Sequence, residues 1–324
     1  MGMRRHFTQE RIVFLLAVVL FASFSVTLPK FLTVGNVLTL VRGVSVLGIL
    51  GIGMALVVIG RGIDLSIVAN MAMSVAWSFA IANQGWPPAV ALLLGLVFAT
   101  VMGLITGLLV AYVEIPPLFA TLAMGAFIYG FGRAWLISSD VTYLPASAGN
   151  LAWIGSGHVH GVPMPIFMLA AACVLAQLFL RYTRYGRYIY GVGDNPLAAR
   201  ITGIPVRPVQ VLQYVISGFV AFAAGLIVAT AVGSMNTRVV NSTLIYDVIL
   251  VVVLGGIGLS GGRGGVRNVL VGTVLIGILL NGMTIMDLQY TVQNLVKSII
   301  LLVAIVVDSI VNPRDEQTAQ QGDI

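Results

Sequence analysis

The sequence predicts an all-α polytopic membrane protein with about ten transmembrane helices. Of its 324 residues, 59% are hydrophobic and only 9% are charged, whereas soluble domains carry about 25% charged residues. The mean hydropathy is +1.03, and the apolar residues form successive runs close to the ~20 residues that cross a bilayer. No soluble core can bury this much apolar surface, so the solvent around this chain is lipid.

Ten apolar runs account for the predicted spans. In chain order they cover 11–28, 44–60, 65–82, 89–112, 118–137, 163–180, 208–232, 244–257, 268–286 and 291–311. The third and eighth runs are the weakest, because both adjoin glycine-rich breaks and the eighth is short. The first run resembles a secretory signal, but it is at the upper limit of the ~15-residue apolar core of such signals. We therefore expect an uncleaved first span.

An even number of spans places both chain ends on one side of the membrane. The connections on that side carry twelve arginines: Arg4, Arg5, Arg11, Arg61, Arg181, Arg184, Arg187, Arg200, Arg207, Arg263, Arg267 and Arg314. The connections on the other side carry four basic residues: Lys30, Arg42, Arg133 and Arg238. Because Lys and Arg are enriched in cytoplasmic loops, we expect both termini in the cytoplasm.

No part of the chain has the composition of a soluble domain. We expect a single transmembrane domain over 1–324, with a disordered polar tail at 313–324. The longest outer segment, 138–164, carries His158 and His160, but no nearby carboxylate or cysteine completes a metal site. The basic residues form no broad face of the kind that binds nucleic acid.

The segment 181–208 is polar, basic and rich in residues that start and stop helices. Asp194 or Asn195 can cap a helix by accepting a backbone N–H bond. Pro196 suits the first helical position, and Gly203 can end the helix in a left-handed conformation. The sequence therefore predicts one short helix at 197–202, outside the bilayer. Such a helix suits the docking of a cytoplasmic partner; a basic loop held by lipid headgroups is the alternative.

Four motifs occur here in the order found in ribose-type ATP-binding-cassette permeases, and the chain resembles that family over nearly its whole length. They are GIDLS at 62–66, the stretch 117–125 with its Thr-Leu pair, the 183–204 segment with TRYGR, GVGDNP, AAR and GI, and SGGRG at 260–264. Residues 67–69 are IVA where the family usually has Val-Gly-Ser. This departure leaves the transported molecule open.

The resemblance implies the permease of an importer for a monosaccharide or related polyol, with a vitamin-B12-importer-like helix bundle in a bacterial plasma (inner) membrane. Its partners would be membrane lipid, a second permease chain, identical or related, two cytoplasmic ATPase subunits and an extracytoplasmic sugar-binding protein. The residues that match the family's ATPase-coupling loop are Arg184, Gly186, Arg187, Gly193, Asp194, Asn195, Pro196, Ala199, Arg200, Gly203 and Ile204. Gly261, Gly262 and Gly264 match its structural glycine-rich loop.

The chain lacks the sequence signatures of an enzyme. It has no Gly-x-x-x-x-Gly-Lys-Ser/Thr phosphate loop, so ATP and Mg would be used by the partner ATPase, and this chain would bind no cofactor. Residues 258–262 fit the Gly-x-Ser-x-Gly pattern of hydrolases, but that turn requires an α/β sheet with His and acidic partners. We therefore expect no catalytic residue and no bound metal.

Polar side chains recur at every fourth position from the start of the third span: Ser66, Asn70, Ser74 and Ser78. In a helix they form one stripe. The stripe would suit a pathway for a neutral polyol, or it would serve the close packing of helices. Thr121 and Asn281 are further candidates for the pathway.

Ionisable residues within spans are costly and usually face the interior of the bundle. Asp247 and Lys297 are two of them, and Asp64 is a third, three residues from Arg61 and able to neutralise it. A proton-coupled role for Asp64 or Asp247 keeps open an ion-coupled secondary carrier as the alternative function. A membrane enzyme would need a cluster of His, Asp or Glu that the sequence does not contain.

Overall fold

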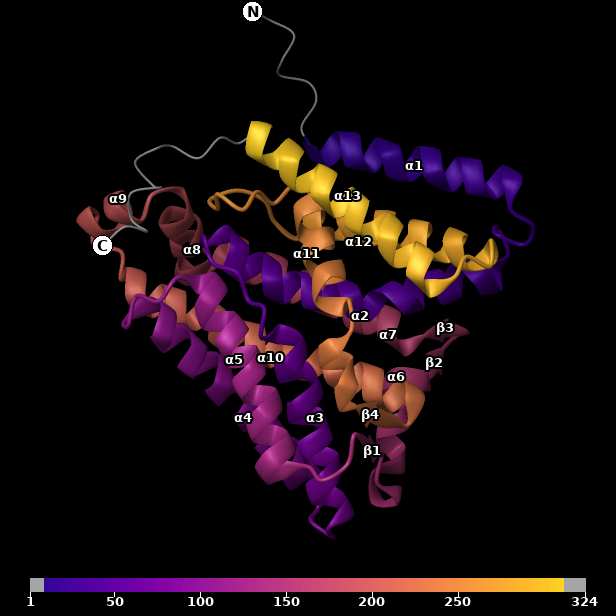
Figure 1. The fold of residues 1–324 in the computed structure, drawn as a ribbon, viewed down its shortest axis with the longest axis horizontal. Helices are drawn as coiled ribbons and strands as arrows, with labels where there is room; N and C mark the ends of the chain where they lie inside the picture. The colour runs from indigo at the N-terminus through magenta and orange to yellow at the C-terminus, as the bar shows by residue number, and fades with distance from the viewer. Residues whose placement is uncertain (1–8, 312–324) are drawn as a thin grey trace, which may run out of the picture.

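The computed structural model describes residues 9–311 and is built almost entirely of helices (Figure 1). Each predicted span coincides with a helix. In chain order these are α1 (Gln9–Thr27), α2 (Val34–Ile59), α3 (Ile67–Asn83), α4 (Pro88–Ala111), α5 (Pro117–Phe131), α7 (Met164–Tyr182), α10 (Val206–Val232), α11 (Leu244–Leu254), α12 (Val266–Ile285) and α13 (Tyr290–Val311). The all-α class is confirmed. The predicted tail at 313–324 lies outside the described residues.

Six helices of the described chain are long and apolar enough to cross a membrane by themselves: α1, α2, α4, α7, α10 and α12. Helices α3 and α11 are shorter, as their glycine-rich borders indicate, and α5 continues through a π-helical turn, Gly132–Leu136. Helices α4, α5 and α7 have proline in their first turn, where no intrahelical N–H bond is lost.

Helix α2 begins ten residues before the predicted start at 44. Residues 34–43 are helical although they include Asn36, Thr39 and Arg42, which lower the hydropathy on which the sequence-based boundary rests. The actual start is fixed by a cap, because the Thr33 hydroxyl accepts a hydrogen bond from Asn36 N at 3.3 Å. The wrong boundary thus reflects a polar first turn rather than a missing helix.

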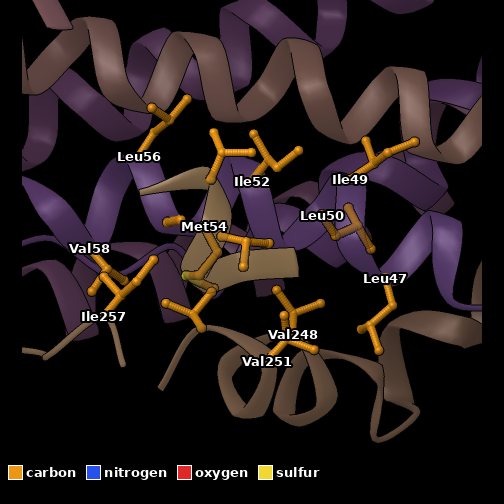
Figure 2. Packing of buried hydrophobic residues seen from close by; sticks show 14 of the residues in the cluster. Leu47, Ile49, Leu50, Ile52, Met54, Leu56, Val58, Val248, Val251 and Ile257 are labelled. Carbon is orange, nitrogen blue, oxygen red and sulfur yellow. The ribbon is translucent and has the colours of Figure 1, made fainter. Parts of the chain in front are cut away.

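The core surrounds α2, which is apolar on all sides and buried from Val44 onward apart from Val46. Side chains such as Leu50 and Met54 lie beside Val248 and Val251 of α11 (Figure 2). A helix that is hydrophobic all round belongs in the middle of a bundle. Helices α1 and α13 lie at the edge, with many apolar side chains exposed.

The segment between α5 and α7 is more ordered than the predicted loop. It contains β1 (Val141–Tyr143), a 3-10 helix (Ala146–Leu151), α6 (Ala152–Ser156), and a hairpin of β2 (His158–Val159) and β3 (Val162–Pro163). Strand β1 pairs antiparallel with β4 (Ser234–Asn236), followed by a 3-10 helix, Thr237–Asn241. Asp140 joins the two parts, with ion pairs to Arg133 at 3.0 Å and to Arg238. The strand pairing and the Asp140–Arg238 ion pair join residues about a hundred positions apart, so they have no local signal.

The connections sort into two ends of the bundle. One end gathers the turn 60–66, the segment 183–205 and the loop 255–265, which share hydrogen bonds. The other end gathers the β1–β4 pair with the turn after α3, where Asn83 Nδ2 donates to Tyr143 O at 2.9 Å. Figure 1 shows the first group beside α8 and α9 at the left and the strands at the right. Consecutive connections of these six lie at opposite ends where one span separates them and at the same end where two do, which is compatible with the predicted ten spans.

Candidate functional site

Two helices, rather than the one predicted, fill the segment 181–208. Helix α9 (Pro196–Ile201) lies where the sequence predicts it, and an additional helix, α8 (Arg184–Asp194), precedes it. Helix α8 was missed because it contains three glycines and few apolar residues. Its buried side, Gly186, Ile189 and Gly193 with Val192 beside them, recurs at three- and four-residue spacing, which is the helical signal that the sequence did carry.

Helix α8 begins tightly against the end of α7. The Thr183 hydroxyl accepts a hydrogen bond from Gly186 N at 2.9 Å and donates to Phe179 O at 2.7 Å. Gly186 packs onto the backbone of Phe179 and Leu180, where a Cβ atom would collide with both. The glycine at this position therefore sets how closely α8 approaches α7.

Helix α9 has the predicted start and end. The Asn195 side-chain oxygen accepts hydrogen bonds from Leu197 N and Ala198 N, both at 3.0 Å, so Asn195 rather than Asp194 is the cap. Gly203 has a φ of +83° and ends the element. Ala199 is buried beneath the helix.

The outer side of α9 is open and partly apolar. Leu197 is 57% exposed and Ile201, one turn later, is 87% exposed. Arg200 lies beside them, also exposed. Arg184 and Arg187 of α8 are exposed as well, and Figure 1 shows α9 projecting from one corner of the bundle. Two exposed apolar side chains one turn apart, with basic neighbours, offer a small contact surface to a protein partner.

Arg61 contacts the end of α8, and the predicted pairing with Asp64 is wrong. Its Nε donates to Gly193 O and its Nη2 to Asp194 O, each at 2.7 Å. Asp64 instead accepts from Ser66 N at 3.0 Å, from Ser66 Oγ at 2.6 Å and from Ser217 Oγ at 2.6 Å. Sequence proximity suggested an ion pair, but the turn points the two side chains toward different helices.

The glycine-rich loop closes over the same place. Gly262 N donates to Ile59 O at 2.7 Å, and Gly193 packs so closely on Ile59 O and Gly262 that it has no room for a Cβ atom. Gly261 and Gly262 have φ values of +78° and +72°, which glycine adopts without strain. We call this contact between the ends of α2 and α8 and the loop 261–264 the three-way junction.

Tyr190 fastens α8 to the far side of that loop. Its hydroxyl donates to Gly264 O at 2.8 Å. Partial burial raises the pKa of the Tyr190 phenol above its ordinary value, so the hydroxyl keeps the proton that it donates.

The residues predicted for the coupling loop differ in burial. Three are buried and support the segment: Gly186, Gly193 and Ala199. Six are exposed: Arg184, Arg187, Asp194, Asn195, Arg200 and Gly203. Pro196 and Ile204 are half-buried.

The polar stripe of α3 lies in a helix-packing seam. Its four side chains are at most 2% exposed. Asn70 Nδ2 donates to Ala99 O of α4 at 2.9 Å, and Ser78 Oγ donates to Ser74 O at 3.0 Å, where Gly95 of α4 leaves room for it. These are the contacts that the packing alternative requires. A role in a pathway would require α4 to separate from α3 during transport.

The other polar span residues are paired within the bundle. Thr121 is buried and donates to Pro117 O at 2.8 Å. Asn281 exchanges two hydrogen bonds with Asn36 of α2, at 2.9 and 3.0 Å. Lys297 of α13 and Asp247 of α11 form an ion pair at 2.8 Å, with side chains 8% and 13% exposed. In the described part of the chain, no group of three His, Cys, Asp or Glu is placed to hold a metal ion.

Comparison with known proteins matches this chain to one family of transport proteins. The model of the family described as branched-chain amino acid transport system / permease component matches residues 36–306. The ribose import permease protein of Escherichia coli K12 is 32% identical over 311 residues, 94% of this chain and 97% of that protein. No solved structure matches the chain.

Two further relatives carry the names of other sugars. The galactofuranose transporter permease protein of Escherichia coli K12 is 33% identical over 277 residues, 85% of this chain and 80% of that protein. The fructose import permease protein of Rhizobium meliloti is 30% identical over 290 residues, 86% of this chain and 79% of that protein.

Proposed function

This chain belongs to the family of the branched-chain amino acid transport system permease component, and from that premise we propose that it is the membrane-spanning permease of an ATP-driven importer for a monosaccharide or related polyol. It is a multi-pass membrane subunit and not the ATPase. The relatives named for ribose, galactofuranose and fructose have nearly the same identity to it, 30–33%. Sequence similarity therefore supports a sugar as the substrate class without favouring one sugar.

The observation that carries the proposal is the capped, projecting helix α9. Leu197 and Ile201 are apolar, exposed and one turn apart on a helix held at both ends. A surface of this kind, fixed by Asn195 and Gly203 and flanked by arginines, suits a cytoplasmic ATPase subunit that pushes or pulls on it. ATP and Mg would be bound and used there, and the sugar pathway would open and close through rigid-body movement of the helices.

The assembly would contain a second permease chain, two ATPase subunits and an extracytoplasmic sugar-binding protein. The end with α8, α9 and the three-way junction would face the cytoplasm of a bacterial cell, with both chain termini on that side, because it holds most of the arginines. The outer end, with the β1–β4 pair, would receive the binding protein. The bundle would be of the vitamin-B12-importer type, forming one permease domain.

The proposal is tested by introducing a charge on α9. Leu197→Asp places a carboxylate where an apolar contact is expected, and desolvating it would weaken binding of the ATPase by about tenfold or more. Because Leu197 is exposed, the variant should insert and unfold as wild type does. The measurement is the amount of ATPase that co-purifies with the tagged chain.

The matched control is Tyr143→Asp on β1, which places the same carboxylate on another exposed side chain, but at the opposite end of the bundle from α9, in the β1–β4 pair. It should leave ATPase binding unchanged. Undiminished co-purification with Leu197→Asp would contradict a docking role for α9.

A further inference from the structure

Arg61 caps the end of α8 from the turn that follows α2. The last carbonyls of a helix have no intrahelical partner and carry the negative end of its dipole. The Arg61 guanidinium donates to two of them, Gly193 O and Asp194 O, both at 2.7 Å. Charge-assisted bonds with this forked geometry are strong and directional. The position of the end of α8 is therefore fixed relative to the end of α2.

The backbone at Arg61 is held in an uncommon conformation. Its φ is +68°, in the left-handed region that strains a residue with a Cβ atom. Arg61 N donates to Val58 O and Gly62 N donates to Val57 O, both at 2.9 Å. These two backbone hydrogen bonds hold the turn against the last turn of α2. A glycine would fit this turn without strain, yet the chain has an arginine whose Nε and Nη2 both donate to the end of α8.

The same turn reaches two further helices. Asp64 bonds to Ser66 N and Ser66 Oγ at the start of α3, and to Ser217 Oγ of α10. Asp64 is 4% exposed, so these bonds lie inside the bundle. The residues 61–64 thus contact α8 on one side and α3 and α10 on the other.

We propose that Arg61 transmits movement of α9 to the α2–α3 turn. Asn195, the cap of α9, directly follows Asp194, so a displacement of α9 moves the carbonyls that Arg61 holds. The turn 61–64 would then carry the movement to Asp64, whose hydrogen bonds to Ser66 connect it to the start of α3. This inference rests on the proposed function, because it assigns Arg61 a positioning role in the coupling of ATP hydrolysis to transport.

A second connection limits the size of the effect. Helix α9 also leads through Ile204 and Pro205 directly into α10. Loss of the Arg61 contacts should therefore weaken communication across the bundle without abolishing it. Coupling free energies of 1–3 kcal/mol are common, so we expect a decrease of about fivefold.

The test compares three variants in the complex of this chain with its ATPase and binding protein. Arg61→Gly removes the guanidinium and suits the positive φ, so the fold is kept. Arg61→Lys keeps the charge but has no fork to reach both carbonyls. Arg207→Ala is the control, because Arg207 lies near the same end but pairs with Glu114. The readout is the factor by which the binding protein stimulates ATP hydrolysis.

We expect Arg61→Gly to retain ATPase binding and basal hydrolysis within about twofold and to lose about fivefold of the stimulation. Arg61→Lys should be intermediate and Arg207→Ala like wild type. Wild-type stimulation in Arg61→Gly, or an equal loss in Arg207→Ala, would overturn the inference alone. A wild-type chain that binds no ATPase would overturn the proposed function, and the inference with it.

Discussion

Asn195 shows how one side chain defines the proposed docking helix. Its oxygen satisfies two of the N–H groups that a helix start leaves free, and replacing such a cap by alanine typically costs about 1 kcal/mol. Its role could be predicted from the sequence because a cap acts on residues two and three positions away. The partners of Arg61 lie 132 and 133 positions away, so no local pattern indicates them, and the sequence suggests the nearby Asp64 instead.

The ion pair of Lys297 and Asp247 allows a prediction about a buried charge. Lys297→Met leaves the Asp247 carboxylate without its partner at an almost fully covered site, and should lower the free energy of unfolding by about 3 kcal/mol. The measurement is unfolding of the purified chain in detergent, followed by tryptophan fluorescence.

The double variant Lys297→Met, Asp247→Leu serves as the control. It replaces both charges by apolar groups and should regain most of the lost stability. A single variant as stable as wild type would show that the pair does not join α11 to α13.

At the scale of elements, close approach of backbones explains why α8 contains glycine. Gly186 and Gly193 lie against the backbones of α7 and α2, respectively, and these contacts hold α8 in place. The cap and stop of α9 predict that helix, whereas the cap of α8, Thr183, lies between the end of α7 and an arginine and was not recognised as a second helix start. The helical spacing of α8 was hidden because two of the buried positions are glycines, which a hydrophobic pattern does not count.

Gly193 and Gly203, in the segment with α8 and α9, should respond differently to substitution by alanine. Gly193→Ala adds a Cβ atom that would overlap Ile59 O and Gly262, so the three-way junction must open. Gly203→Ala meets no neighbouring atom and is strained only by its φ of +83°, a cost of about 1 kcal/mol. We expect Gly193→Ala to increase hydrogen exchange throughout 184–201.

Gly203→Ala should increase exchange only at the end of α9. Exchange of the amides can be followed by mass spectrometry on the chain in nanodiscs. Equal protection of 184–194 in wild type and Gly193→Ala would mean that the junction does not hold α8.

At the scale of the whole molecule, the apolar runs predicted the helices because their apolar side chains must be covered either by lipid or by the protein core. They could not show which helix is central. Helix α2 is packed on all sides by other helices, whereas α1, which is nearly as apolar, lies at the edge. They also could not show that the stripe of α3 is covered by α4 and α10, since small polar residues suit a packing seam and a pathway alike.

The two ends of the bundle give the proposed importer its direction. One end holds the three-way junction and α9, and the other holds the β1–β4 pair. In the proposed importer, each end would contact a different partner, and ATP hydrolysis on the ATPase would supply the driving force. That property separates it from an ion-coupled carrier, which would need only this chain and a gradient.

Uptake by proteoliposomes tests this claim most directly. Vesicles would contain either the chain alone or the chain with its ATPase and binding protein, with radiolabelled D-ribose, D-fructose and D-galactofuranose as probes. We predict uptake of at least one sugar only in the complete complex with ATP, and none by the chain alone under a proton or sodium gradient. Uptake by the chain alone at the rate of the complete complex would contradict the account.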